Sequence, residues 1–241
     1  MVKNNVLILA GGIGSRMNSP TPKQFLEVCG KPIIVHTILN FQKNDAIDEI
    51  GVVCTEDWIG HLENLVEKFN LSKVSWIIPG GNSAHNSIKY GLYNFKNSMG
   101  ADDFIVIHDA ARPILPQAAI RVLLEKAHLH GNASLAIPCY ETVVITKDGI
   151  SGNSQIDRSS IMRVQTPQAY RYSLITELYE RADIDGLDDF VYANLVAIHY
   201  GCRIYFARGF VNNLKITRPE DIVLFEALLN FDENLLYDPQ L

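Results

Sequence analysis

Short apolar runs alternate with stretches of helical length along the first 140 residues, and this alternation limits the possible folds most strongly. The runs are rich in Val and Ile and are not alternately polar, which is typical of strands covered on both faces. We expect strands at residues 6–9, 50–54, 74–78, 104–108 and 134–138. We expect helices at residues 33–43, 58–69, 87–95 and 116–130. The alternation predicts an α/β fold with a Rossmann-like, doubly wound, mostly parallel sheet, whose ligands bind at the carboxyl ends of the strands.

The pattern changes after residue 138. A β-branched run at residues 141–145 and the turn signal Lys147-Asp148-Gly149 precede a polar, irregular stretch at 150–162. These features predict a β-arm that leaves the main sheet at about residues 139–165. Further along, we expect helices at 172–182, 189–200 and 219–229, and a strand at 202–207. We interpret residues 1–229 as a single domain and residues 230–241 as a C-terminal tail with little pattern, which we expect to fray.

Composition argues against several classes of protein. The chain has 21 basic and 27 acidic residues, a formal charge of −6, whereas a protein that binds a nucleic-acid backbone is more often basic. Its four cysteines form no CxxC pair, which argues against a zinc ribbon and favours a reducing compartment. No apolar run approaches the ~18 residues of a spanning helix or resembles a signal peptide. We therefore expect a cytoplasmic protein without a nucleic-acid or membrane partner.

A glycine-rich loop follows the first strand. It reads Leu9-Ala10-Gly11-Gly12-Ile13-Gly14, and Arg16 and Lys23 follow it. Glycines let a backbone approach a ligand closely, and consecutive N–H groups can surround an anion. The loop matches neither GxxxxGK[ST] nor GxGxxG. A glycine turn with two solvated cations is the alternative, but the two cations close behind the glycines favour phosphate binding.

A second glycine pair, Gly80-Gly81, follows the third strand, and Asn82 comes next. Ser87 could begin the following helix as its N-cap. Alternatively, this loop faces the first one and its backbone groups recognise a base.

The fourth strand ends in His108-Asp109-Ala110-Ala111-Arg112-Pro113. A carboxylate at this edge could hold Mg²⁺ or bind a substrate, and a structural Asp109–Arg112 ion pair is the alternative. We expect His108 to be a buried, hydrogen-bonded histidine rather than a base.

Other polar residues lack a helical or strand period. They are Thr142, Asp157, Arg158, Thr166 and Gln168. Near the end of the chain, Lys215 lies between two apolar residues, where it could be solvated at a strand end or take part in a site.

Together these segments resemble the cytidylyltransferases that act on ribitol 5-phosphate or 2-C-methyl-D-erythritol 4-phosphate. Eight matching segments occur in the order of that family between about residues 5 and 225. They are LAGGIGSRM (9–17), PKQFLE (22–27), GKPIIVHTI (30–38), GG with a later Ser (80–87), IHDAARP (107–113), DR (157–158), QTPQAY (165–170) and NLKITRPED (213–221). One such loop would be weak evidence, whereas eight in order are specific.

The resemblance implies a homodimer in which a substrate phosphate attacks the α-phosphorus of CTP and releases pyrophosphate, with Mg²⁺ bridging the phosphates. It implies catalytic roles for Arg16, Lys23 and Lys215. It implies nucleotide binding by Leu9, Ala10, Gly11, Gly12, Gly14, Gly80, Gly81, Asn82 and Ser87. It implies binding of the polyol phosphate by Asp109, Arg112, Thr142, Arg158 and Thr166, with Asp109 also as a metal ligand. The arm would help to complete the partner's site.

Two departures from the family pattern point to a divergent member. Ala84 occupies the place of the arginine in GGxxRxxS, and the segment nearest to the family's Thr-Asp pair is Gly186-Leu187-Asp188-Asp189. Trp58, His61 and residues 35–41 are more similar to the ribitol-phosphate branch, whereas the arm and the 218–221 segment fit the methylerythritol branch equally. We favour an alditol phosphate, although likeness at the level of the fold does not fix a substrate.

Three other classes stay open. A hexose-phosphate nucleotidyltransferase that uses UTP or GTP would share the first loop, but is not expected to carry QTPQ and NLKIT in this order. A nucleotide-binding module without catalysis is compatible with Ala84. A dinucleotide-dependent oxidoreductase is disfavoured by the missing GxGxxG.

Overall fold

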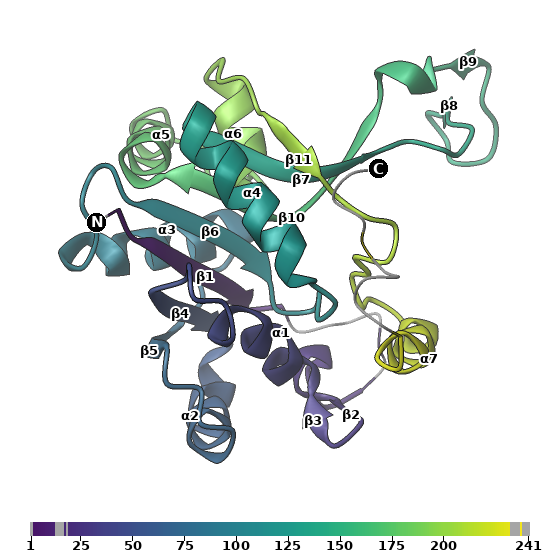
Figure 1. The fold of residues 1–241 in the computed structure, drawn as a ribbon. Coiled ribbons are helices and arrows are strands. Elements are labelled where there is room, and N and C mark those ends of the chain that lie inside the picture. The colour runs from purple at the N-terminus through teal and green to yellow at the C-terminus, as the bar shows by residue number, and fades with distance from the viewer. Residues whose placement is uncertain (1, 13–16, 18, 232–236, 238–241) are drawn as a thin grey trace.

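The computed structural model describes residues 2–12, 17, 19–231 and 237 (Figure 1). A seven-stranded sheet forms its centre, in the order β11-β7-β10-β6-β1-β4-β5. Its strands are β1 (Asn4–Ala10), β4 (Glu49–Cys54), β5 (Val74–Pro79), β6 (Phe104–Asp109), β7 (Asn132–Pro138), β10 (Met162–Arg171) and β11 (Phe206–Arg208). Strands β6, β1, β4 and β5 pair in parallel, as β11 and β7 do. The predicted α/β fold with a mostly parallel sheet is confirmed.

Strand β10 makes the sheet mixed, because it runs antiparallel between β6 and β7. We did not predict a strand there. Pro167 interrupts the run, and proline removes a donor from the ladder. The structure accommodates it with a shift in register between Val164 and Gln168, so the strand continues through the break.

Helices cover both faces of the sheet. Alternate residues of β1 show this, because Val6 and Ile8 belong to one hydrophobic core and Leu7 belongs to the other. The first core is covered by α1 (Ile33–Gln42), α2 (Ile59–Lys68), α4 (Gln117–His130) and α7 (Pro219–Leu228). The second is covered by α3 (Ala84–Asn94), α5 (Tyr172–Ile184) and α6 (Ala193–His199). Burial on both faces explains why the strands read as continuous apolar runs.

Two elements near the end of the chain are shorter than expected. The helix predicted at 189–200 is only α6, and the strand predicted at 202–207 is reduced to β11. The Asn132 side chain donates to the Arg203 carbonyl at 3.0 Å and accepts from the Tyr205 N–H at 3.2 Å. The Ser134 N–H also donates to the Tyr205 carbonyl at 2.9 Å, so bonds from β7 hold the backbone just before β11.

The predicted arm is present. After β7 the chain leaves the sheet, forms the small hairpin of β8 (Val144–Ile145) and β9 (Ser154–Gln155), and returns as β10. Figure 1 shows this hairpin projecting away from the helices. Its apolar side chains are exposed, Ile150 to 91%. A second small hairpin, β2 (Glu27–Val28) with β3 (Lys31–Pro32), precedes α1.

In the tail, Tyr237 is buried, and its hydroxyl donates to the Arg208 carbonyl at 3.1 Å. At this residue the tail packs against the domain, in contrast to the fraying we expected. The boundary between domain and tail stays a prediction.

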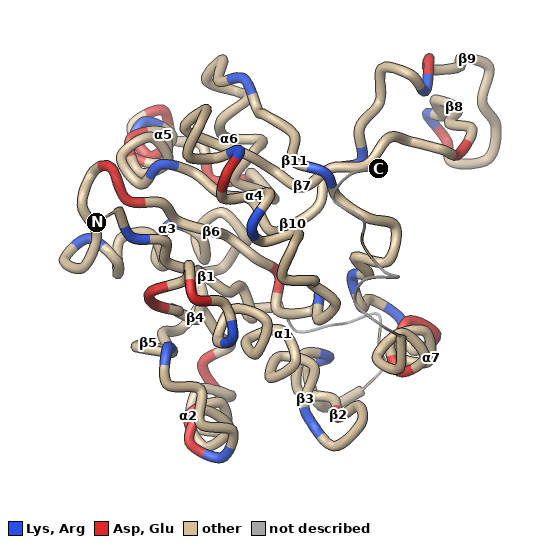
Figure 2. Tube along the Cα trace, viewed as in Figure 1, with Lys and Arg blue, Asp and Glu red and all other residues tan. Residues whose placement is uncertain are grey.

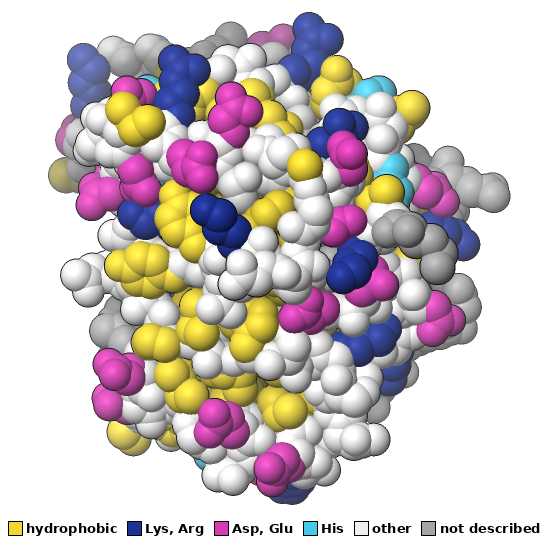
Figure 3. All heavy atoms as spheres, turned by 90° about the vertical axis from the view of Figure 1, so that its left-hand side faces the viewer, with side chains coloured by type: hydrophobic (Ala, Val, Ile, Leu, Met, Phe, Trp, Pro, Cys, Tyr) yellow, Lys and Arg dark blue, Asp and Glu magenta, His cyan; other side chains and the backbone are white. Residues whose placement is uncertain are grey.

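Basic and acidic residues are interspersed along the described chain rather than separated into large patches of one sign (Figure 2). On the face in Figure 3, hydrophobic side chains gather among charged ones. Among the helices of the described residues, none is both long enough and apolar enough to cross a membrane.

Candidate active site

The candidate site is built around Asp109, the last residue of β6. Its Oδ2 lies 3.0 Å from Arg112 Nε and 3.0 Å from Lys215 Nζ. The side chains of Asp109 and Arg112 are each 12% exposed, and that of Lys215 is 29% exposed. Two cations therefore contact one carboxylate oxygen at the carboxyl edge of the sheet, and Lys215 is the more accessible of them.

Hydrogen bonds that each involve at least one backbone group hold this cluster together from three distant segments. Arg112 donates to the Asn213 carbonyl at 2.7 Å, and the Ile216 N–H donates to the Ala111 carbonyl at 2.9 Å. The buried Asn213 amide donates to the Thr166 carbonyl at 2.8 Å, and Thr166 Oγ1 accepts from the Asp109 N–H at 3.2 Å. These bonds fix the loop after β6, the middle of β10 and residues 213–216 relative to one another.

Charges around Asp109 decide its protonation. Burial alone would raise the pKa of its carboxyl group, but Lys215 and Arg112 outweigh burial and lower the pKa to about 2. Asp109 is therefore ionised at neutral pH.

His108 is fully buried, and its Nε2 lies 3.0 Å from the Arg112 carbonyl oxygen. Burial lowers its pKa to about 4. The expectation of a buried, hydrogen-bonded histidine is confirmed.

The two glycine loops lie on either side of Ser87. Its Oγ accepts from the Gly81 N–H at 3.1 Å and donates to the Ser83 carbonyl at 2.9 Å. A Cβ atom would lie 3.6 Å from this oxygen if placed on Gly11, and 3.1 Å if placed on Gly80. The structure thus brings the loops after β1 and β5 together, as expected for strand ends in a parallel sheet.

Ser87 does not cap the helix. Helix α3 begins at Ala84, and its N-cap is Ser83, whose Oγ accepts from the Asn86 N–H at 3.1 Å. Both serines satisfy the residue preference of an N-cap, so composition alone could not separate them. Ser87 instead fixes the second glycine loop.

Lys23 connects the first loop to the Asp109 cluster. Its Nζ donates to the Ile216 carbonyl at 2.8 Å, next to Lys215 in the chain. The neighbouring Gln24 donates to the carbonyls of Ala10 at 2.6 Å and Gly12 at 3.0 Å. The two predicted catalytic lysines, 192 positions apart, therefore lie on one edge of the sheet.

The remaining predicted residues differ in their placement. Leu9 is half-buried in β1 and pairs in register with Asp109, and Asn82 is exposed. Gly14 and Arg16 lie outside the described residues.

Thr142 and Arg158 are exposed on the arm, where the Arg158 guanidinium donates to the Tyr140 carbonyl at 3.2 Å. Among the described contacts, none joins these two arm residues to the Asp109 cluster within a single chain.

Sequence reasoning missed Tyr192. Its hydroxyl lies 3.2 Å from Lys215 Nζ, and it lines a cavity of about 220 Å³ beside the cluster. The other lining residues are Arg112, Val164, Gln165, Thr166, Gln168, Asn194 and Leu195. Tyr192 gave no signal, because it lies within a segment that we expected to be helical throughout.

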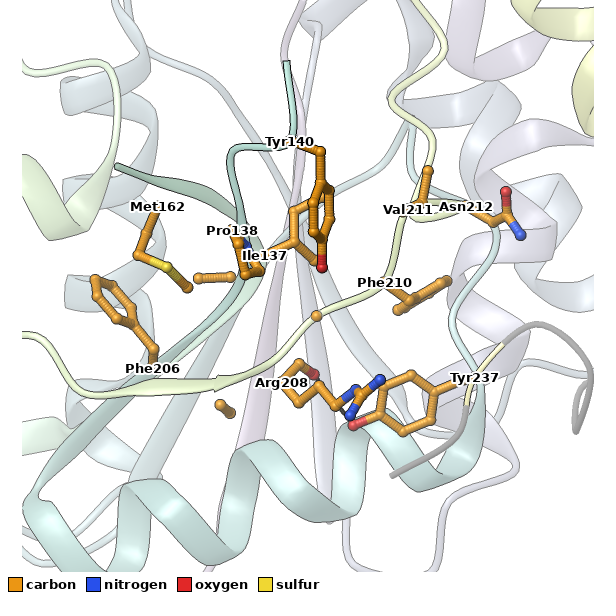
Figure 4. Close-up of a pocket in the computed structure, with 13 residues that line it drawn as sticks. Ile137, Pro138, Tyr140, Met162, Phe206, Arg208, Phe210, Val211, Asn212 and Tyr237 are labelled. Atoms are coloured by element: carbon orange, nitrogen blue, oxygen red, sulfur yellow. Dashed lines mark hydrogen bonds between the residues drawn. The ribbon is translucent and has the colours of Figure 1, made fainter. Parts of the chain in front are cut away.

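A larger cavity of about 570 Å³ lies elsewhere, at the base of the arm (Figure 4). Tyr140, Phe206, Arg208 and Tyr237 are among its lining residues. It contains none of the residues that we predicted for the site. Although this cavity is larger, we place the candidate active site at Asp109, because the charged side chains meet there.

Metal binding is limited by the available ligands. The described residues contain no group of three or more His, Cys, Asp or Glu side chains that could hold an ion. Both cations contact Asp109 Oδ2, so a metal ion would bind through Oδ1 or displace a cation. Asp109 fits as one carboxylate ligand of an ion that takes its other ligands from phosphate and water.

The family comparison covers nearly the whole chain. The model of the family described as IspD, 2-C-methyl-D-erythritol 4-phosphate cytidylyltransferase, matches residues 5–231. The chain belongs to this cytidylyltransferase family. It is therefore a nucleotidyltransferase.

Two relatives within the cytidylyltransferases carry different substrate names. The chain is 35% identical to the ribitol-5-phosphate cytidylyltransferase of Lacticaseibacillus paracasei, over 94% of this chain and 98% of the relative. It is 36% identical to the 2-C-methyl-D-erythritol 4-phosphate cytidylyltransferase of Clostridium novyi, over 95% of this chain and 97% of the relative. A solved 4-diphosphocytidyl-2C-methyl-D-erythritol synthase matches with a TM-score of 0.81 and 26% identity, over 95% of this chain and 99% of that one.

We predict that Asp109→Asn lowers the free energy of unfolding by roughly 3 kcal/mol at pH 7, since two partly buried cations lose their carboxylate. The folded pKa near 2 lies below the ordinary value of 3.8. The contribution of Asp109 is thus fully present above pH 4 and is lost as the pH falls through 2. Denaturant unfolding should show the two proteins converging as the pH falls through this range.

Asp102→Asn is the matched control. Asp102 pairs with Arg171 at 3.4 Å, but its side chain is 81% exposed, so this variant should lose less than about 1 kcal/mol. A difference between wild type and Asp109→Asn that stays constant from pH 7 to pH 2 would contradict the low pKa.

Proposed function

We propose that this cytidylyltransferase converts CTP and D-ribitol 5-phosphate to CDP-ribitol and pyrophosphate. The observation that carries the proposal is the meeting of Lys23 and Lys215 beside Asp109, next to the two glycine loops. A polyphosphate in this position would face backbone N–H groups and two lysine ammonium groups. In the cytoplasm, CDP-ribitol would supply ribitol phosphate for wall or capsule polymers.

The proposed reaction needs positioning and charge neutralisation more than covalent chemistry. A phosphate oxygen of the polyol attacks the α-phosphorus of CTP, and the bond to the pyrophosphate oxygen breaks. Lys23 and Lys215 stabilise the charge that grows on the α-phosphate, together with Arg16. Gly11, Gly12 and Gly14 surround the triphosphate, while Gly80, Gly81, Asn82 and Ser87 contact cytosine and ribose. Mg²⁺ supplies further charge neutralisation when bound, with Asp109 as a ligand.

The polyol is proposed to occupy the cavity beside Asp109. Hydrogen-bonding side chains of Thr166, Gln168, Tyr192 and Asn194 line it, and the Asn194 Oδ1 has no hydrogen-bond partner among the described residues.

The name of the Lacticaseibacillus relative supports ribitol 5-phosphate as the substrate. 2-C-Methyl-D-erythritol 4-phosphate is the second candidate, supported by the family model and the Clostridium relative.

We predict that Lys23→Ala and Lys215→Ala each reduce turnover about 10²- to 10³-fold, because losing a group that stabilises transition-state charge costs about 2.7–4 kcal/mol in comparable sites. Pyrophosphate release from CTP with Mg²⁺ and ribitol 5-phosphate measures the effect. The melting temperature should change little, since Arg112 still pairs with Asp109 when Lys215 is removed.

Lys73→Ala is the matched control for this experiment. Lys73 is also half-buried and donates to a backbone carbonyl, that of Asn44 at 2.6 Å, but it lies just before β5, at the opposite end of that strand from Gly80. Its replacement should leave turnover unchanged. Turnover at the wild-type level in both Lys23→Ala and Lys215→Ala would refute the assigned role of these lysines.

We further propose that the enzyme is a homodimer in which the arm of one chain completes the site of the other. Thr142 and Arg158 support this, because both are exposed on the arm and make no described contact with the site of their own chain. Their polar side chains would then bind the polyol phosphate of the partner, opposite Thr166 and Arg112.

Mixing Arg158→Ala chains with Lys23→Ala chains is predicted to restore activity, because half of the heterodimer sites would contain neither substitution. Up to about a quarter of the wild-type rate is expected from a statistical mixture. Each variant mixed only with itself is the control. Heterodimers that form, as shown by mass spectrometry, but stay inactive would contradict the exchanged arm.

A further inference from the structure

Tyr192 contacts the catalytic-site lysine from an element that carries none of the predicted site residues. Its hydroxyl lies 3.2 Å from Lys215 Nζ, and its ring centroid lies 5.3 Å from the same nitrogen. Tyr192 directly precedes α6 and has an extended backbone (φ −139°, ψ 150°). Its half-buried side chain is assigned to neither hydrophobic core and lines the cavity beside Asp109. Core packing therefore does not account for its position.

The number of hydrogen bonds that Lys215 can donate shows what the contact with Tyr192 does. A lysine ammonium group has three N–H donors and no acceptor. Asp109 Oδ2 at 3.0 Å and Tyr192 Oη at 3.2 Å can accept two of these bonds. The ammonium group is thereby held by two elements, and one donor is left for an anion in the cavity.

The two acceptors differ in charge. Asp109 partly neutralises Lys215, whereas the Tyr192 hydroxyl and ring hold the ammonium group as a neutral acceptor and a polarisable face. If Tyr192 were absent, the carboxylate would be the only described acceptor for Lys215. An incoming phosphate would then have to draw the lysine away from a full negative charge.

We propose that Tyr192 is a positioning residue, which holds the Lys215 ammonium group between Asp109 and the phosphate that reacts. The proposal rests on the function proposed above, in which Lys215 stabilises the transferring phosphate. It assigns to Tyr192 a role exerted through Lys215 rather than through the fold.

A double-mutant cycle tests this role. Tyr192→Phe removes the hydroxyl and keeps the ring, and it is made both in the wild type and in Lys215→Ala. The measurements are kcat and KM with ribitol 5-phosphate, the dissociation constant of CTP, and the melting temperature. Tyr200→Phe is the matched control, since the Tyr200 hydroxyl donates to the charged Asp185 at 2.8 Å on the surface.

We expect Tyr192→Phe to lower kcat about tenfold with an unchanged melting temperature, the size expected for a hydrogen bond to a charged group. In the Lys215→Ala background it should cause no further loss, and Tyr200→Phe should behave as the wild type. An equal loss in both backgrounds, or no loss in either, would overturn the proposal.

The two hypotheses fail in different ways. A wild-type enzyme that releases no pyrophosphate with any polyol phosphate tested would sink the proposed function alone. The cycle is then read from CTP binding. Weaker binding in Tyr192→Phe only when Lys215 is present would still support the positioning role, and equal weakening in both backgrounds, or none, would overturn it.

Discussion

The Asp109 carboxylate, placed between Arg112 and Lys215, is the interaction on which the rest of the site depends. Its negative charge holds one cation from its own loop and one from a segment about a hundred residues later. The two cations offset the burial of the carboxylate and lower its pKa despite desolvation. Lys215 is the more exposed of the two cations, so it is the side chain that a phosphate at this edge of the sheet could reach. One buried charge thus joins the loop after β6 to the segment around residue 215, at the edge of the sheet where we propose that phosphate binds.

The network around this charge explains why residues from the whole chain are needed. Asn213 contacts Thr166 and Arg112, and Lys23, which follows the first glycine loop, contacts Ile216. Backbone carbonyls therefore join three parts of the chain to residues 213–216. The Ile216 carbonyl fixes Lys23 without cancelling its charge, whereas Lys215 is held by the Asp109 carboxylate and the Tyr192 hydroxyl. Ala84 is exposed in the first turn of α3, at the position where the resemblance to the family implies an arginine. Under the proposed function, Lys23 and Lys215 would neutralise the phosphate charge without a further cation from this position.

Much of the fold was predictable because it follows from local pattern. The strands buried on both faces read as apolar runs, and their carboxyl ends located Gly11, Gly80 and Asp109 at one edge. The strand β10 was missed because a proline interrupts it, and the capping serine of α3 was assigned wrongly because Ser83 and Ser87 are chemically equivalent. Tyr192 could not be found from the sequence. Its role depends on a contact across 23 residues with Lys215, which only the folded chain creates.

We propose above all that this chain joins CTP to an alditol phosphate. This proposal is tested most directly by measuring pyrophosphate release from CTP and Mg²⁺ with ribitol 5-phosphate and 2-C-methyl-D-erythritol 4-phosphate in parallel. We predict rapid release with ribitol 5-phosphate and slow or no release with the methylerythritol compound. Release with the methylerythritol compound alone would contradict the proposed substrate. If CTP binds but neither compound causes pyrophosphate release, the proposed reaction would be contradicted.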